Sequence, residues 1–250
     1  MEDILKYGFS LFKDGQYELA IKTYEKAIGL NPSCAPAHAF IGFSLISLNK
    51  FKDAIAPLKT ALALGENNHF VTGRLGWAYL EIGNFDESIK YYTIAIEHKN
   101  DDVSFFQNRG LAYCNLKRFD LAINDFTKAL DIEGFNEEVL LSRGACYVNL
   151  GLISEAINDY DTILAINPNF YQAYYNMGNA NLLLDKVDEA HNNYIKAYEI
   201  NDKDSDVLTN IGILNMLNGE EKTGALLLLK SAILGDKNAI DKLNYLKKKL

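Results

Sequence analysis

The stretch YQAYYNMGNANLLLDKVDEAHNNYIKAYEI, residues 171–200, contains the pattern that decides the fold. Within it, Gly178 lies among apolar residues at helical spacing, although glycine costs a helix interior roughly 0.5–1 kcal/mol relative to alanine. Steps of 34 residues from Gly178 reach another glycine every time, at Gly8, Gly42, Gly76, Gly110, Gly144 and Gly212. A constant period of this length indicates an internal repeat.

Further columns follow the same period when Met1 is counted as position 1 of the first repeat. Positions 20 and 27 hold mainly small residues, and position 24 holds a large one. The columns are Ala20, Ala54, Ser88, Ala122, Ala156, Ala190 and Gly224 at position 20; Tyr24, Leu58, Tyr92, Phe126, Tyr160, Tyr194 and Leu228 at position 24; and Ala27, Ala61, Ala95, Ala129, Ile163, Ala197 and Ser231 at position 27. Because glycine and alanine remove side-chain bulk, we expect two helices to approach closely there, which assigns Gly178 to packing.

Each repeat contains two helical patterns. Positions 3, 7, 10, 11 and 14 are mostly apolar or small, as are positions 17, 20, 21, 24, 27 and 28. Short polar breaks such as DGQ (14–16) or GN (83–84) separate the two patterns. This spacing predicts an all-α protein built of antiparallel helix pairs with short loops.

A 34-residue unit of two helices with this pattern resembles the tetratricopeptide repeat (TPR) family. The resemblance implies a right-handed α-solenoid, and it covers one domain, 1–250, with seven repeats and a capping helix. The expected repeats are 1–34, 35–68, 69–102, 103–136, 137–170, 171–204 and 205–238, and the capping helix is 239–250. Lys247, Lys248 and Lys249 suit the C-terminal end of that helix, where cations meet the negative end of the dipole.

Composition narrows the classes of function. The net charge of -8 and the pI near 5.1 argue against nucleic acid as a partner, since phosphate binding needs a basic surface. The three cysteines, Cys34, Cys114 and Cys146, form no CxxC pair, which indicates neither a disulfide framework nor a zinc site and favours a cytoplasmic location. The stretch MEDILKYGFSLF (1–12) lacks the features of a secretion signal. No segment reaches the about 18 apolar residues of a membrane span, so no membrane insertion is expected.

The sequence also indicates no catalytic, metal or cofactor site. His38, His69, His98 and His191 fall at four different repeat positions, so the solenoid would not bring them together. No HExxH, GxSxG or glycine-rich phosphate loop occurs in the chain. We therefore expect that the protein is not an enzyme and needs no cofactor.

A binding surface is the remaining expectation. The resemblance implies that the first helix of each pair, the A helix, lines a concave groove, with positions 2, 5, 6, 9, 12 and 13 facing or bordering it. Those positions change in character along the chain. The candidate binding residues are Phe9, Phe40, Phe43, Phe70, Arg74 and Trp77 in the N-terminal half and Asn108, Ser142, Tyr175, Asn176, Asn179 and Asn210 in the C-terminal half.

The two groups suggest two modes of contact. Exposed aromatic residues are candidate anchors for a partner, although packing between repeats is an equal alternative for the position 9 column that contains Phe9 and Phe43. Asparagine amides can pair with both the N–H and the C=O of an extended peptide. This resembles the asparagine ladder of the O-linked N-acetylglucosamine transferases. The alternative is that asparagine is simply frequent in the family and in this chain.

One known TPR ligand is disfavoured. The clamp for the C-terminal carboxylate of heat-shock chaperones has lysine at position 5 and asparagine at position 9. Asparagine at position 6 of the next repeat follows, and then lysine at position 2 and arginine at position 6. Here position 5 carries no lysine, and Arg74 follows Phe40 at position 6. The motif therefore fails in every register.

The sequence thus predicts a non-enzymatic scaffold or adaptor that binds an extended peptide or amphipathic helix of a protein partner in its groove. One alternative is a chaperone or assembly factor for a secreted or complex-forming protein. Another is an accessory recognition subunit of a separate enzyme. A homodimer formed through the terminal repeats is a further predicted partnership.

Overall fold

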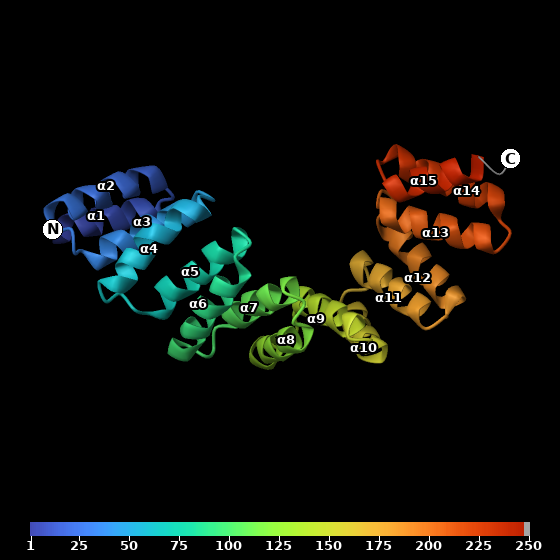
Figure 1. Cartoon of the computed structure of the whole chain (residues 1–250), viewed down its shortest axis with the longest axis horizontal. Helices are drawn as coiled ribbons and strands as arrows, with labels where there is room; N and C mark the ends of the chain where they lie inside the picture. The colour runs from blue at the N-terminus through green and yellow to red at the C-terminus, as the bar shows by residue number, and fades with distance from the viewer. Residues whose placement is uncertain (248–250) are drawn as a thin grey trace. The chain divides into compact units, whose positions relative to one another are not determined.

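The computed structural model describes residues 1–247, with side chains described through Tyr245. Fifteen α-helices and no strands form these described residues (Figure 1). The helices are α1 (Glu2–Lys13), α2 (Tyr17–Leu30), α3 (Ala35–Ser47), α4 (Phe51–Ala63), α5 (His69–Glu81), α6 (Phe85–His98), α7 (Val103–Asn115), α8 (Phe119–Glu133), α9 (Glu137–Asn149), α10 (Ile153–Ile166), α11 (Tyr171–Leu183), α12 (Val187–Ile200), α13 (Ser205–Leu217), α14 (Glu221–Ile233) and α15 (Lys237–Lys247). The predicted all-α class is confirmed.

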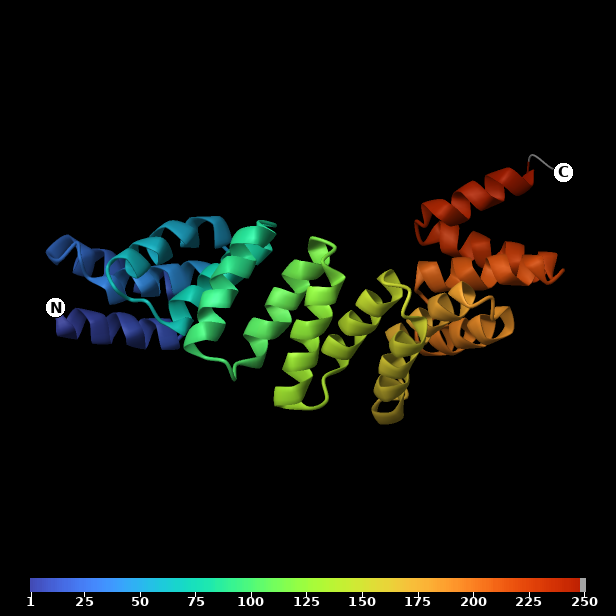
Figure 2. The same cartoon turned by 60° about the horizontal axis from the view of Figure 1, so that its bottom comes forward.

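The chain divides into two compact units, Met1–Gly134 and Phe135–Leu250, close to the junction of the fourth and fifth repeats. Within each unit, successive helices pack as pairs and each pair packs on the next (Figure 2). Every predicted repeat contains an A helix and a second helix, the B helix, and α15 follows the seventh repeat as the extra helix. It begins two residues before the expected 239, and Lys248 and Lys249 of the predicted cap lie outside the described residues. The organisation of 1–250 as a single domain stays a prediction.

The same backbone device ends the A helix of every repeat. Residues of positive φ lie at position 15 of all seven repeats, namely Gly15, Asn49, Gly83, Lys117, Gly151, Asp185 and Gly219. Their amide N–H groups bond back to the end of the preceding helix, as Gly83 N–H does to the Leu80 carbonyl. A left-handed residue after a helix reverses the chain and satisfies terminal carbonyls. Each pair therefore closes through a three-residue turn.

Glycine at position 8 seats the large side chain at position 24. A Cβ atom added at Gly178 would lie 2.5 Å from Cε1 of Tyr194, and one added at Gly76 would lie 2.9 Å from the ring of Tyr92. In the first six repeats, the side chain at position 24 lies directly on the glycine at position 8, and this contact makes the expected close approach. In the seventh repeat, a Cβ atom added at Gly212 would lie 3.0 Å from both the backbone oxygen of Gly224 and Cγ of Leu228.

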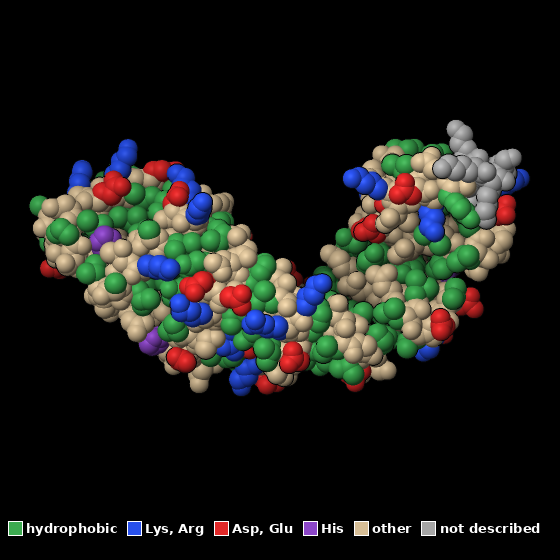
Figure 3. All heavy atoms as spheres, viewed as in Figure 1, with side chains coloured by type: hydrophobic (Ala, Val, Ile, Leu, Met, Phe, Trp, Pro, Cys, Tyr) green, Lys and Arg blue, Asp and Glu red, His purple; other side chains and the backbone are tan. Residues whose placement is uncertain are grey.

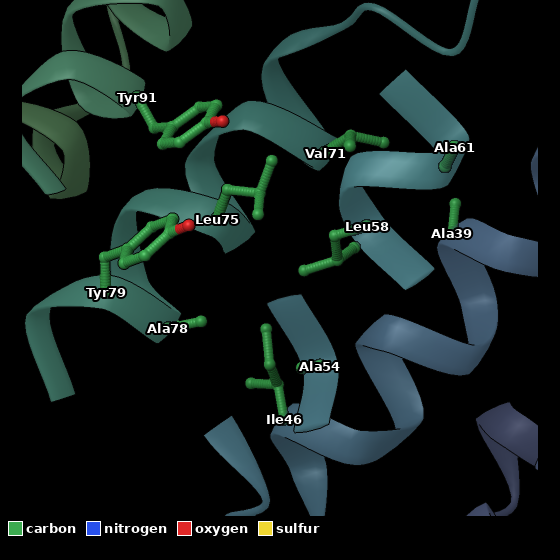
Figure 4. Packing of buried hydrophobic residues seen from close by; sticks show 10 residues of the cluster. All are labelled: Ala39, Ile46, Ala54, Leu58, Ala61, Val71, Leu75, Ala78, Tyr79 and Tyr91. Atoms are coloured by element: carbon green, nitrogen blue, oxygen red, sulfur yellow. The ribbon is translucent and has the colours of Figure 1, made fainter. Parts of the chain in front are cut away.

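Figure 4 shows how the pairs share a core in the first unit. Its side chains come from α3, α4, α5 and α6, with Leu58 and Leu75 completely buried at the centre. The rings of Tyr79 and Tyr91 stack with centroids 5.6 Å apart. Burial of each leucine stabilises the fold by roughly 1.5–3 kcal/mol. The core therefore runs through the interfaces between pairs as well as within them.

One buried ion pair joins the two helices of the fourth repeat, and a second joins the two helices of the fifth repeat. The Arg109 guanidinium donates to both Asp125 carboxylate oxygens, at 2.8 and 2.7 Å, and also to Thr93 Oγ1 at 3.0 Å. Arg143 makes the same two bonds to Asp159 at 2.9 and 2.7 Å. The sequence signal for these pairs is arginine at position 7 with aspartate at position 23 of the same repeat, which the apolar pattern alone does not reveal.

Candidate functional site

The first three aromatic candidates lie close together in the N-terminal repeats. The Phe40 ring packs at 5.4 Å from both Phe9 and Phe43, edge to face, and stacks on Tyr24 at 5.3 Å. Phe40 therefore fills the junction between the first and second pairs. Phe43 is half-buried against the core, whereas Phe9 stays 44% exposed. In this cluster, Phe9 is the ring most available to a partner.

A pocket opens between α5 and α7, with a volume of about 440 Å³. Gly73 lies in its wall, and a Cβ atom there would lie 2.6 Å from Cε1 of Phe105. The missing side chain at position 5 lets the Phe105 ring lie against α5. The pocket is lined by His69, Phe70, Gly73, Arg74, Trp77, Tyr92, Asp102, Ser104, Phe105 and Asn108.

The apolar walls of this pocket are aromatic. Phe70 is 63% exposed, although it stacks on His69 with ring centroids 4.0 Å apart. Trp77 is half-buried against Phe51 at 5.8 Å, and its indole N–H donates to Glu81 at 2.9 Å. Exposed rings beside a pocket are typical of interaction sites.

Arg74 supplies the positive charge of the pocket. Its guanidinium lies over the Trp77 ring, 5.3 Å from the centroid, in a cation–π contact. Among the described residues, no carboxylate pairs with Arg74. Asp102, the nearest acid in the lining, caps α7 by accepting from the N–H and hydroxyl of Ser104, and Lys99 lies 3.9 Å from its other oxygen. The arginine is therefore free to meet an anion.

A buried hydroxyl also lines the pocket. Tyr92 is 1% exposed, and its hydroxyl has no hydrogen-bond partner among the described residues. Burial raises the pKa of this phenol above its ordinary value, while the adjacent Asn108 amide and the Arg74 charge oppose that rise. The hydroxyl of Tyr24, at the same position of the first repeat, also lacks a partner in the described part of the chain, so this feature is not specific to the pocket.

The polar candidates of the second unit have partners within the protein. The Tyr194 hydroxyl donates to Asn179 Oδ1 at 2.7 Å. The ring of Tyr175 lies 5.9 Å from that of Tyr194, and burial raises the pKa of the Tyr175 phenol, against hydrogen bonds from Asn179 and Asn210. Of the asparagines predicted to form a ladder, Asn179 and Asn210 thus contact buried tyrosines, while Asn176 is half-buried on α11.

The structure brings some predicted site residues together and leaves others apart. Phe70, Arg74, Trp77 and Asn108 line one pocket. Ser142 lies half-buried on α9 in the second unit. The other six residues of the pocket lining were not predicted, namely His69, Gly73, Tyr92, Asp102, Ser104 and Phe105. A glycine outside the position 8 column was the available signal for Gly73.

A second surface was also not predicted. Leu226, Leu229 and Ile233 are 67%, 50% and 78% exposed on one face of α14. They occupy positions 22, 25 and 29 of the seventh repeat. The first five repeats have polar, charged or small residues at all three positions, so this apolar face is specific to the end of the array.

The charged side chains show no comparable concentration. On the face drawn in Figure 3, lysine and arginine are interspersed with aspartate and glutamate, and hydrophobic side chains lie between them. No helix within the described part of the chain has the length and apolar character needed to cross a membrane.

Helix pairs of constant length that share one continuous core within each unit define a helical-repeat protein of the α-solenoid class. The chain belongs to the tetratricopeptide repeat family. Family models described as tetratricopeptide repeat match residues 5–34, 74–136, 137–170 and 159–192. This family consists of protein–protein interaction domains. No curated protein was found to match the chain in sequence.

Solved structures with the same fold are distant in sequence. The C-terminal part of a TPR repeat-containing protein from Cytophaga hutchinsonii is 20% identical, with a TM-score of 0.80 over 96% of this chain and 99% of that one. YrrB, a TPR protein with an unusual peptide-binding site, is 22% identical, with a TM-score of 0.64 over 72% and 92%. PilW, a type IV pilus biogenesis factor, is 17% identical, with a TM-score of 0.69 over 84% and 98%. These likenesses concern the fold alone.

Proposed function

We propose that this protein is a non-catalytic interaction module that binds an extended peptide or amphipathic helix along its A helices. The observation that carries the proposal is the pocket between α5 and α7, where exposed Phe70 and half-buried Trp77 lie beside the unpaired Arg74. Aromatic residues and arginine dominate the energetics of protein interfaces. The similarity to YrrB, named for its peptide-binding site, supports this choice of partner. The cytoplasmic location stays a prediction from the cysteine content.

The proposal explains why this pocket differs from the packed junctions of the array. The packing columns at positions 8, 20, 24 and 27 are filled and buried in the third repeat, where Gly76, Ser88, Tyr92 and Ala95 meet. Tyr92 and Phe105 of the pocket lining belong to this core, whereas the exposed Phe70 ring is not required to complete it. A partner that covered Phe70 would remove apolar surface from water, which stabilises a complex by about 25 cal/mol per Å² before the costs of association.

Affinity capture tests this function. The wild-type chain is compared with Phe70→Ala/Trp77→Ala and with Leu30→Ala/Leu121→Ala, a control that truncates exposed leucines of α2 and α8 outside the pocket. We expect the first variant to lose partners that wild type and control retain, while all three show the same circular dichroism. Retention of every partner by a folded Phe70→Ala/Trp77→Ala variant would refute the proposal.

An assembly-factor role is the second candidate. It is favoured by the apolar face of Leu226, Leu229 and Ile233, which would hold a second protein while the A helices hold a peptide. The likeness to PilW, a pilus biogenesis factor, agrees with such a role. The test is light scattering and co-purification of wild type beside Leu226→Gln/Ile233→Gln. Loss of a co-purified partner supports this role, loss of a dimer identifies the predicted homodimer instead, and no change in either measurement excludes both.

A further inference from the structure

We propose that the outer face of α14, made by Leu226, Leu229 and Ile233, binds a second copy of this chain, with the two α14 helices antiparallel across a two-fold axis. This inference goes beyond peptide binding and uses none of the residues of the pocket between α5 and α7. It rests on the spacing of the three apolar residues, on the charges at the two ends of α14, and on the polar side chains around the face.

The three residues form one stripe along α14. Their spacing, three residues and then four, places side chains on one face of a helix. Each buried residue of α14 is two places from a member of the stripe, which is roughly 200° around the helix. These buried residues are Gly224, Leu228 and Ser231. The stripe therefore points away from the core of its own chain, and an exposed apolar patch of this kind is typical of an interaction surface.

The stripe is complementary to itself. Leu229 lies in its middle, with Leu226 about one turn before it and Ile233 about one turn after it. When two copies meet antiparallel with Leu229 beside the axis, the Leu226 end of each copy meets the Ile233 end of the other. A two-fold interface uses the same patch on both partners and requires this kind of match. A second copy therefore covers the whole stripe of both chains at once.

The charges at the ends of α14 favour the antiparallel orientation. Glu220 and Glu221 are exposed at the start of the helix, and Lys237 is exposed shortly after its end. An antiparallel copy brings the start of one helix beside the end of the other, so the two acids meet Lys237 of the second copy. Lys222 lies in the first turn, where its own helix dipole disfavours a cation, and it comes to the negative C-terminal end of the other α14. A parallel copy would bring like charges together.

Polar side chains border the stripe on the side of α12. Lys230 donates to the Tyr198 hydroxyl at 3.0 Å and lies 3.7 Å from Asp202. The exposed residues Asn192 and Glu199 of α12 occupy repeat positions 22 and 29, which are apolar on α14. An apolar centre with a polar rim is the usual anatomy of a protein interface. Because the apolar centre is small, we expect a reversible dimer, since obligate interfaces are larger and more apolar.

Analytical ultracentrifugation of the full chain at micromolar to millimolar concentrations tests the association. We expect the mean mass to rise with concentration from that of one chain toward that of two. Leu229→Lys places two like charges beside the axis, so this variant should keep the mass of one chain throughout. The matched control is Leu30→Lys, which changes an exposed leucine of α2 and should associate like wild type. All three side chains involved are exposed or half-exposed, so circular dichroism should be unchanged.

Cysteine cross-linking with added diamide as the oxidant tests the orientation. Leu229→Cys should form a covalent dimer, because a disulfide needs Cα atoms within about 7 Å and only the residue beside the axis meets its own copy. Leu226→Cys and Ile233→Cys should each cross-link poorly alone but readily when mixed, with a tag on one chain to identify the mixed product. Wild type under the same conditions gives the background from Cys34, Cys114 and Cys146.

The outcomes separate a second copy from other occupants of the face. A mass of one chain at every concentration, or a dimer that persists in Leu229→Lys, overturns the inference. Cross-linking of Leu226→Cys to itself in preference to Ile233→Cys overturns the antiparallel orientation. If the chain stays single while Leu229→Lys loses a different protein that wild type captures, the face belongs to that protein and the inference is wrong. Peptide binding is tested separately, by Phe70→Ala/Trp77→Ala.

Discussion

The pocket between α5 and α7 differs from the equivalent region between α11 and α13 at one decisive position. Position 5 is Gly73 in the first region and Tyr175 in the second. In the first region the Phe105 ring lies against Gly73, a pocket opens beside it, and the Tyr92 hydroxyl has no partner among the described residues. In the second region the ring of Tyr175 lies beside Tyr194, whose hydroxyl bonds to Asn179. The same helix-pair framework therefore provides an open site in one unit and a satisfied junction in the other.

The largest expected effect tests the framework that both regions share. Asp125→Ala removes the carboxylate that pairs with the largely buried Arg109, and Asp159→Ala removes the one that pairs with Arg143, so each should cost about 3 kcal/mol of unfolding free energy. Urea denaturation measures the cost. Because the two pairs have the same geometry, clearly unequal losses would show that the frameworks are not equivalent.

The glycine column offers the next test. Gly178→Val places carbon atoms on the Tyr194 ring, where a Cβ atom alone would approach to 2.5 Å, and should destabilise the protein by roughly 1–3 kcal/mol or more. The control is Gly29→Ala, since a Cβ atom at Gly29 meets nothing within 4 Å. Thermal denaturation compares the two variants. An unchanged melting temperature for Gly178→Val would contradict the packing assignment.

Replacement of Gly73 by tyrosine, the residue at position 5 of the region between α11 and α13, should abolish the difference between the two regions. Gly73→Tyr introduces the side chain that the second unit has at Tyr175, and its Cβ atom would meet Phe105 at 2.6 Å. We expect a loss of stability of about 1–3 kcal/mol and loss of the partners that affinity capture recovers with wild type. Isothermal calorimetry provides a second measure of binding. Wild-type affinity in this variant would show that the pocket is not the binding site.

One substitution made in both regions sharpens the comparison further. Tyr194→Phe removes a hydroxyl that bonds to Asn179 and should cost about 1 kcal/mol, whereas Tyr92→Phe removes an unsatisfied hydroxyl and should be neutral or stabilising. Urea denaturation of the two variants gives the difference directly. A larger loss for Tyr92→Phe would contradict the open state of the pocket.

The smallest effect appears only at alkaline pH. Burial raises the pKa of the Tyr92 and Tyr194 phenols above the ordinary value of 10.0, so the folded state keeps protons that the unfolded state releases. Stability is therefore fully present below pH 10 and falls as the pH rises above it. Each Tyr→Phe variant should flatten this fall in a pH series of urea denaturation curves, and the unaltered slope of both would contradict the burial of these groups.

Much of the fold could be predicted because the same packing contacts recur every 34 residues. Gly178 and Tyr194 belong to columns at constant spacing, so helix pairing, helix count and the role of the glycine follow from the period of the apolar pattern. The Arg109–Asp125 and Arg143–Asp159 pairs were missed because they occur in only two repeats and use charged residues in a helix pair where apolar residues are expected.

The candidate site was harder to predict because it depends on what is missing. Arg74 and Trp77 stand out by their variable position on the A helix, but the pocket wall also depends on Phe105, whose ring lies where a side chain at position 73 would be. The asparagine column suggested peptide contacts, yet Asn179 and Asn210 also meet the buried tyrosines of their own unit. The repeat position of a residue gives its place on its own helix, whereas the groups that its side chain contacts depend on the neighbouring helices.

The most direct test of the contrast is a nuclear magnetic resonance titration of the isotope-labelled chain with a partner recovered by affinity capture. The account predicts amide shift changes concentrated in His69–Glu81 and Val103–Asn115, which are α5 and α7, and much smaller ones in Tyr171–Leu183 and Ser205–Leu217. Changes concentrated in α11 and α13, or spread evenly over both units, would contradict it.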